Sequence, residues 1–254
     1  KEEIAEKGIN AASGGHLGYI PGGGIFASAL GDFLADVTNE YAGIFYASPG
    51  AVAVETSLID WIKTLFSYPS DAVGNLASGG SIANLIALTA ARDKHRIKGE
   101  RIEKSVVYLS AQTHHCVIKA LRIIGLEDLV LRTLPVDGRS RVRVEALSEA
   151  IKKDRNLGLN PFLVVGSVGT TDTGAVDPLF EIGSICQEEN LWFHVDAAYG
   201  GFFILAESVK HLFKGVELSD SLVIDPHKGL FLPYGIGAVL VKDREAVFHS
   251  NRVG

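Results

Sequence analysis

Short apolar runs alternate along this chain with longer segments in which apolar residues recur at helical spacing. Near-continuous apolar runs of four or five residues are typical of strands buried on both faces of a sheet. Such runs occur at Ser105–Leu109, Phe162–Val165, Trp192–Val195, Ser221–Ile224 and Ala238–Val241. Helical periodicity predicts helices at Ser81–Arg92, His115–Ile124, Val144–Arg155 and Leu179–Glu189. Strands that alternate with helices predict an α/β domain with a mainly parallel sheet flanked by helices.

The pattern predicts one domain over residues 51–254, preceded by an N-terminal arm at residues 1–50 that is rich in glycine. A length of 254 residues, 47% of them hydrophobic, is sufficient for a single large core. The sequence contains no methionine, begins at Lys1 and stops soon after a strand-like stretch. We therefore expect it to be a segment of a longer protein.

The charge of the chain and its cysteines limit which ligands and which cellular compartment can be expected. Charged residues make up 21% of the chain and the net charge is −6, without the clustered Lys and Arg that nucleic acid or an anionic membrane would require. No apolar run reaches the roughly 18 residues of a membrane span, and no cleavable leader is visible. Cys116 and Cys186 have neither metal-ligand nor disulfide spacing. We expect a cytoplasmic protein with no metal site.

One lysine is placed where a nucleophilic amine could act. The predicted strand Ser221–Ile224 ends in Asp225-Pro226-His227-Lys228, and a further apolar run follows. Burying an ammonium group is costly unless it is paired or loses its proton, and a desolvated lysine can attack a carbonyl group. From this segment alone, a surface lysine beside an Asp-Pro turn is an equally good interpretation.

Asp196 follows the predicted strand Trp192–Val195, at the sheet edge where open α/β folds bind ligands. Its carboxylate could cap a helix, ligate a metal or pair with a cationic heterocycle. The metal interpretation lacks companion ligands. Because Lys228 follows the next predicted strand, the two together favour a site for pyridoxal 5′-phosphate (PLP), in which a carboxylate keeps the pyridine nitrogen protonated.

Three other segments could complete such a site. Ala77–Ser81 (ASGGS) runs into a predicted helix, so its amides could bind a phosphate, although a turn with Ser81 as N-cap is the plainer alternative. The segment matches neither the P-loop nor the dinucleotide fingerprint. His114, with His115, could stack on a ring or simply begin a helix. The hydroxyls of residues 169–174 could bind a cofactor or shape a turn.

Taken together, these segments resemble the group II PLP-dependent amino-acid decarboxylases, which include the aromatic-L-amino-acid, tyrosine, glutamate and cysteine-sulfinate decarboxylases. The matching segments are ASGGSIANLIALTAAR (77–92), GTTDTGAVDPL (169–179), HVDAAYGG (194–201) and DPHKGLFLPYG (225–235), with looser matches at YIPGGG (19–24) and YLSAQTHHCV (108–117). The resemblance implies the large domain of the fold type I PLP-dependent transferases, with a seven-stranded sheet. It also implies decarboxylation of an L-amino acid to its amine and carbon dioxide.

Residue by residue, the resemblance implies that the catalytic residues are Lys228, Asp196 and His114. Lys228 would form the internal aldimine with PLP, and Asp196 would pair with the pyridine nitrogen. His114 would stack on one face of the ring, with Ala198 against the other. The remaining implied contacts are Gly80, Ser81, Ser221 and His227 at the phosphate, Thr171 near the cofactor, and Pro21 and Gly22 in a substrate-side loop.

The chain departs from the family pattern at Asp225, where many relatives carry Asn. A carboxylate would repel a phosphate dianion, so we expect Asp225 to act at the cofactor pocket through its backbone or to point elsewhere. The family's small C-terminal domain, and a mobile loop with a catalytic tyrosine, have no counterpart in these 254 residues.

The resemblance further implies a homodimer with the active site at its interface. Tyr199 favours the aromatic branch of the family for the amino-acid substrate. Two alternatives stay open: an aminotransferase or carbon–carbon lyase on the same fold, and a non-catalytic protein that keeps the PLP fold.

Overall fold

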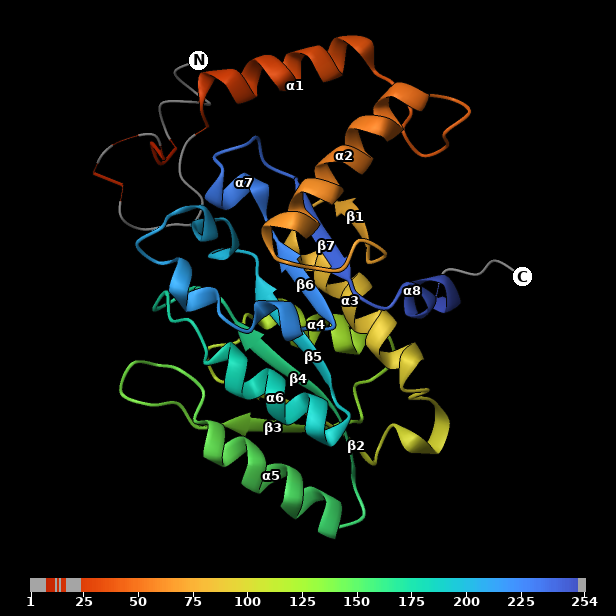
Figure 1. Ribbon diagram of the computed structural model, residues 1–254, viewed down its shortest axis with the longest axis vertical. Coiled ribbons are helices and arrows are strands. Elements are labelled where there is room, and N and C mark those ends of the chain that lie inside the picture. The colour runs from red at the N-terminus through yellow and green to blue at the C-terminus, as the bar shows by residue number, and fades with distance from the viewer. Residues whose placement is uncertain (1–7, 12, 14, 17–23, 251–254) are drawn as a thin grey trace.

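A single mixed sheet forms the centre of the molecule (Figure 1). The computed structural model describes residues 8–11, 13, 15, 16 and 24–250, the side chains of 248–250 excepted. The strands are β1 (Val73–Ala77), β2 (Ser105–Ser110), β3 (Val130–Leu134), β4 (Asn160–Ser167), β5 (Trp192–Ala197), β6 (Ser221–Ile224) and β7 (Gly237–Val241). Their order is β1-β7-β6-β5-β4-β2-β3, and only β7 runs antiparallel to its neighbours. The predicted α/β fold with a mainly parallel, seven-stranded sheet is confirmed.

Helices cover both faces of this sheet (Figure 1). The helices of the described part of the chain are α1 (Phe26–Thr38), α2 (Pro49–Leu65), α3 (Gly80–Lys94), α4 (His115–Ile123), α5 (Val144–Asn156), α6 (Leu179–Glu189), α7 (Pro226–Gly229) and α8 (Arg244–Ser250). Short 3-10 helices occur at Gly99–Arg101, Gly201–Leu205, Lys210–Phe213 and Val216–Leu218. Each of the four predicted helices is present, with ends that differ from the prediction by at most two residues.

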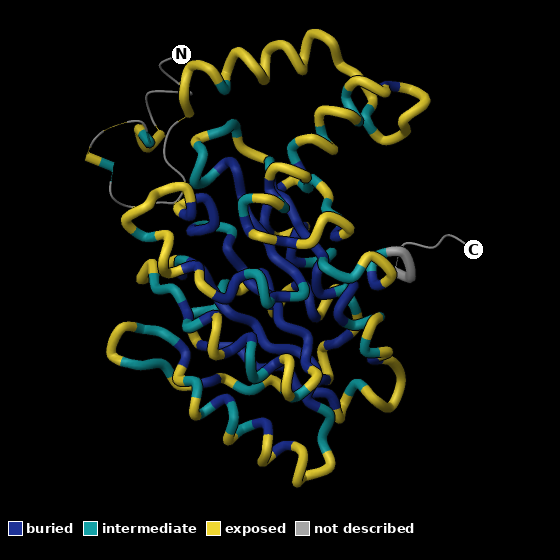
Figure 2. Tube along the Cα trace, viewed as in Figure 1, coloured by how far each residue is buried: buried dark blue, intermediate teal, exposed yellow. Residues whose placement is uncertain are grey.

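The hydrophobic core consists of two clusters, one on each face of the sheet, because successive side chains of a strand point to opposite faces. One cluster lies between the sheet and α2, α5 and α6, and contains Val106 and Val164. The other lies between the sheet and α3, α4 and α8, and contains Val107 and Val165. Buried residues therefore fill the centre of the molecule from both sides (Figure 2).

Two strands and four helices have no counterpart in the prediction: β1, β3, α1, α2, α7 and α8. Strand β1 (VGNLA) lacks an apolar run, and its Gly74 is required by packing, because a Cβ there would lie 2.7 Å from the Leu240 side chain. Strand β3 lies at the sheet edge and exposes alternate residues. Helix α1 lies within the predicted N-terminal arm, whereas α2 lies almost entirely in the predicted domain, because the expected boundary between residues 50 and 51 falls in its first turn.

Two structural findings bear on the class of protein. Among the described residues, none of the helices has both the length and the apolar character needed to cross a membrane. In the same part of the chain, no group of three or more His, Cys, Asp or Glu side chains is placed to hold a metal ion.

Candidate active site

A cavity of about 270 Å³ opens where β4, β5 and β6 end and where α3 and α4 begin. Its volume is close to the lower limit of about 300 Å³ for small-molecule pockets. Side chains from segments far apart in the sequence meet there because parallel strands end at one edge of the sheet. The predicted site residues that line it are Gly80, Ser81, His114, Thr171, Asp196, Ala198, Asp225, His227 and Lys228.

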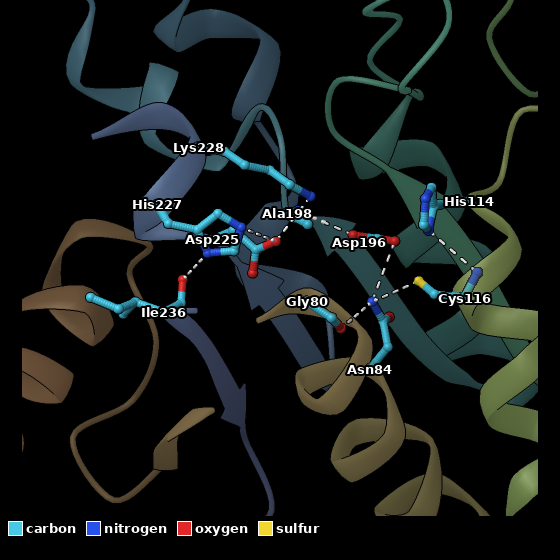
Figure 3. A network of polar contacts seen from close by, with 10 residues as sticks. All are labelled: Gly80, Asn84, His114, Cys116, Asp196, Ala198, Asp225, His227, Lys228 and Ile236. Atoms are coloured by element: carbon cyan, nitrogen blue, oxygen red, sulfur yellow. Dashed lines mark hydrogen bonds and ion pairs between the residues drawn. The ribbon is translucent and has the colours of Figure 1, made fainter. Parts of the chain in front are cut away.

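Lys228 is held in the single turn of α7, directly after β6. Pro226 at the first helical position fixes the backbone for this turn, and the Lys228 amide donates to the Asp225 carbonyl at 3.0 Å. The Lys228 side chain is 24% exposed, and its Nζ lies 2.9 Å from Asp225 Oδ2 (Figure 3). The lysine is therefore a partly buried, paired group in the cavity wall rather than a surface turn residue.

The Asp225 carboxylate is buried beside the beginning of α3. Its side chain is 1% exposed, and Oδ1 accepts no hydrogen bond from the described residues. Glycines make room for it: a Cβ on Gly80 would lie 2.7 Å from Oδ2, and one on Gly237 would lie 2.8 Å from Oδ1. Asp225 thus lines the cavity with its side chain, whereas the sequence led us to expect a role for its backbone or a side chain directed elsewhere.

Asp196 lies at the end of β5 and is buried. Its Oδ1 accepts the Ala198 amide at 3.1 Å, and the Asn84 amide nitrogen lies 3.5 Å from Oδ2 (Figure 3). Burial raises the pKa of Asp196, while the Ala198 amide and the positive charge of Lys228 act in the opposite direction. A cationic group bound in the cavity would satisfy this buried carboxylate.

His114 precedes α4 and caps it: its Nδ1 accepts the Cys116 amide at 3.3 Å (Figure 3). Its ring lies 4.1 Å, centroid to centroid, from that of His115. Burial, followed by the neighbouring His115, lowers the pKa of His114, so the imidazole is neutral at physiological pH. A neutral aromatic ring at the cavity wall is suited to stacking on a flat cofactor.

The beginning of α3 provides a site for an anion. The N-cap is Gly79, with φ of 122° and no side-chain cap, so Ser81 lies inside the helix and is not its cap. Gly80 and Ser81 line the cavity with the first helical amides, which have no acceptor within a helix. On the other side His227 Nδ1 donates to the Ile236 carbonyl at 2.6 Å, which fixes its ring (Figure 3).

One predicted residue, Ser221, is not brought into the cavity. Ser221 begins β6, whereas Asp225 follows its end, and four residues of strand separate them by about 13 Å. Ser221 instead hydrogen-bonds Trp192 and His194 inside the core. Pro21 and Gly22 lie outside the described residues.

Some cavity residues were absent from the prediction, among them Gln112, Cys116, Ser167 and Asn84. For Asn84 the signal was present: it follows Gly80 by four residues on the same predicted helix, and residues at this spacing share a face. Its amide reaches the Gly80 carbonyl at 2.9 Å and approaches Asp196.

These residues fit PLP. The cavity combines a lysine amine, a buried carboxylate without a buried cation of its own, and a helix beginning that favours a dianion. Asp225 carries a charge that opposes a phosphate at this place, and Lys228, whose Nζ lies 2.9 Å from its Oδ2, offsets that charge.

Comparison with known proteins agrees with the geometry. The family described as "Pyridoxal-dependent decarboxylase conserved domain" matches residues 8–254. The aromatic-L-amino-acid decarboxylase of Bacillus atrophaeus is 39% identical over 237 residues, which are 93% of this chain and 49% of that protein. Tyrosine decarboxylase 2 of Narcissus pseudonarcissus is 36% identical over 245 residues, 92% of this chain and 49% of that protein.

Solved structures show the same likeness. Catharanthus roseus tryptophan decarboxylase, in complex with L-tryptophan, superposes with a TM-score of 0.87 at 26% identity, over 93% of this chain and 52% of that one. This chain spans about half the length of the relatives it matches. From the matched family, the identity of its relatives and the arrangement of the cavity, the chain belongs to the pyridoxal-dependent amino-acid decarboxylase family.

Proposed function

We propose that this chain holds PLP through Lys228 and forms the cofactor-binding part of an enzyme that decarboxylates an aromatic L-amino acid. The observation that supports it most is the meeting of Lys228, Asp196 and the beginning of α3 in one cavity. These features come from segments far apart in the sequence, and PLP is a ligand that would use an amine, a carboxylate and an anion site together.

Bound PLP supplies an electron sink for the electrons released when a bond to the amino acid's Cα breaks. The chain's own groups would prepare that reaction. The Lys228 amine, freed of its proton and of its contact with Asp225, would hold the cofactor at its carbonyl carbon, whose oxygen would leave as water. The Asp196 carboxylate holds a proton on the ring nitrogen, His114 packs on the ring, and the first amides of α3 bind the phosphate.

An aromatic substrate is supported by the relatives and by one side of the cavity. The matched relatives named above are decarboxylases of aromatic amino acids, tyrosine and tryptophan. Tyr199 and Tyr234 line the cavity, and the Tyr199 ring meets that of Phe203 edge to face at 5.7 Å. Aromatic pairs of this geometry provide a surface that favours another ring.

A homodimer is supported by α1, which has no buried residue. Its exposed apolar side chains are Phe26, Leu30, Phe33, Leu34 and Val37. The helix stands apart from the sheet, exposed along almost its whole length (Figure 2). Apolar surface of this extent marks an interface with another chain, and a second copy is the partner expected from the family resemblance.

A cytoplasmic location is supported by the cysteines. Cys116 and Cys186 are buried free thiols, as is usual in a reducing compartment.

The reaction is tested by incubating the purified, PLP-loaded protein with a panel of amino acids and measuring carbon dioxide, keto acid and aldehyde. Carbon dioxide and the amine, formed faster from tyrosine, tryptophan or 3,4-dihydroxyphenylalanine than from glutamate, are the expected products. Keto acid without carbon dioxide would indicate transamination and contradict the proposal. Lys228→Arg keeps the positive charge but cannot replace the amine, so it should abolish both products.

A further inference from the structure

A line of buried hydrogen bonds approaches the Asp196 carboxylate from the core. Trp192 Nε1 donates to Ser221 Oγ at 2.8 Å, Ser221 Oγ lies 2.8 Å from His194 Nδ1, and His194 Nε2 lies 2.7 Å from Asn84 Oδ1. The Asn84 amide nitrogen then lies 3.5 Å from Asp196 Oδ2. We call Trp192, Ser221, His194 and Asn84 the buried relay; each is at most 3% exposed.

The strand period explains why these residues meet. Trp192, His194 and Asp196 alternate along β5 and so share the face that packs on α3. On neighbouring β6, Ser221 points to that same face, with His194 as its paired residue. Asn84 is buried on the facing side of α3. The relay is therefore fixed by the sheet and one helix, and by no loop.

The donors and acceptors of the relay can run in only one direction. The Gly80 carbonyl and the Asp196 carboxylate can only accept, so the Asn84 amide nitrogen faces them and Asn84 Oδ1 faces His194. At the other end the Ser221 hydroxyl accepts from the Trp192 indole and donates to His194 Nδ1. His194 then carries its proton on Nε2 and donates to Asn84 Oδ1. This turns the Asn84 amide nitrogen toward the Gly80 carbonyl and Asp196 (Figure 3). Burial lowers the pKa of His194 to about 3, so the ring stays neutral.

We propose that His194 is a positioning residue, which through the orientation of Asn84 holds the Asp196 carboxylate as an acceptor for the pyridine nitrogen of PLP. Without the His194 Nε2–H, the Asn84 amide could turn over and direct its oxygen at the carboxylate. The two oxygens would repel, and the amide would lose its bond to the Gly80 carbonyl. This inference rests on the proposed function and adds to it a residue that does not line the cavity.

The orientation is first tested without cofactor. Nitrogen NMR of the histidine rings in PLP-free protein should show His194 neutral, with its proton on Nε2 and Nδ1 unprotonated. A proton on Nδ1, or a ring that gains charge near pH 6, would overturn the proposed direction of the relay.

The role toward the cofactor is tested by comparing the affinities for PLP and for 1-deaza-PLP, which has a C–H in place of the ring nitrogen. His194→Phe keeps a ring but removes both hydrogen bonds, and should weaken PLP about tenfold while leaving the analogue nearly unchanged. His194→Gln, whose amide can donate to Asn84 Oδ1, should recover most of the loss. Ser221→Ala should also weaken PLP binding, by a few-fold, and leave the binding of 1-deaza-PLP nearly unchanged. This variant replaces His194→Phe in the test if His194→Phe does not fold.

Tyr68→Phe is the matched control, because it removes an equally buried hydrogen bond, from Tyr68 to Ser219 at 2.5 Å, that has no link to Asp196. Its ratio of the two affinities should equal that of the wild type. Equal weakening of both cofactors by His194→Phe would mean a structural role only and would overturn the inference. A wild-type protein that binds neither cofactor would instead overturn the proposed function, and the inference with it.

Discussion

Replacing Asp196 by Asn tests how the cavity recognises the ring nitrogen of PLP. The substitution keeps the shape of a side chain that is 8% exposed but removes its charge. The Ala198 amide can still bond the remaining carbonyl oxygen. What is lost is the charge-assisted hydrogen bond that a carboxylate would make to a protonated pyridine nitrogen.

The magnitude follows from the two kinds of hydrogen bond. A bond to a charged group contributes about 1.5–3 kcal/mol and a neutral one about 0.5–1.5 kcal/mol. The difference, roughly 1.5 kcal/mol, corresponds to about tenfold weaker PLP binding. The stability of the PLP-free protein should not fall at neutral pH. Because burial raises the pKa of Asp196, its charge costs stability above the folded-state pKa, and Asn removes that cost.

The assay is a titration of PLP-free protein with PLP, followed by visible absorbance, together with urea unfolding of the PLP-free form. Asp220→Asn is the control. Asp220 is also a carboxyl group whose pKa is raised by burial, but it bonds the Phe193 amide at the opposite end of β5. Wild-type affinity in Asp196→Asn, or equal loss of affinity in Asp220→Asn, would refute the assigned role of Asp196.

Three further predictions concern the fold and its association. Burial raises the pKa of Asp154, but the hydrogen bonds from Arg132 and Tyr108, together with the charge of Arg132, outweigh it and hold that pKa below its usual value. Asp154→Ala should cost about 2 kcal/mol in urea unfolding, because Arg132 is partly exposed, and the difference should fade as the pH falls below about 4. Gly200→Ala would place a Cβ 2.4 Å from a backbone carbonyl oxygen and should cost about 1–3 kcal/mol, whereas Gly138→Ala, with open space around it, should change the unfolding free energy by under about 0.5 kcal/mol. Phe33→Asp on α1 should convert the dimer to a folded monomer in sedimentation experiments, and an unchanged mass would contradict the proposed interface.

The central strands and their helices could be predicted from the sequence because each carries a complete pattern. Strands β4 and β5 each contain a near-continuous apolar run, which is typical of a strand in a sheet covered on both faces. Strand β1 contains Gly74 and Asn75 and owes its place to pairing with β7, a contact more than 160 residues away that no local pattern contains. Helix α1 carries apolar residues at helical spacing, at Phe26, Leu30, Phe33 and Val37, so a local signal was present that the prediction did not use.

The site could be predicted to the same extent. Asp196 lies at the end of one parallel strand and Lys228 follows the end of the next, so their meeting at one edge of the sheet was expected from position alone. Ser221 was assigned to the phosphate by resemblance, although its place at the beginning of β6 puts it a strand's length from the cavity. The pairing of Asp225 with Lys228 depends on room left by Gly80 and Gly237, and this room exists only in three dimensions.

The central claim is that the Lys228 amine bonds PLP. The most direct measurement is to load the protein with PLP, reduce it with borohydride, digest it and locate the added mass by mass spectrometry. If the Lys228 amine bonds PLP, the label is expected on the peptide that contains Lys228, and no label is expected in the Lys228→Arg variant. A label on another lysine, or a wild-type protein that takes up no PLP, would contradict it.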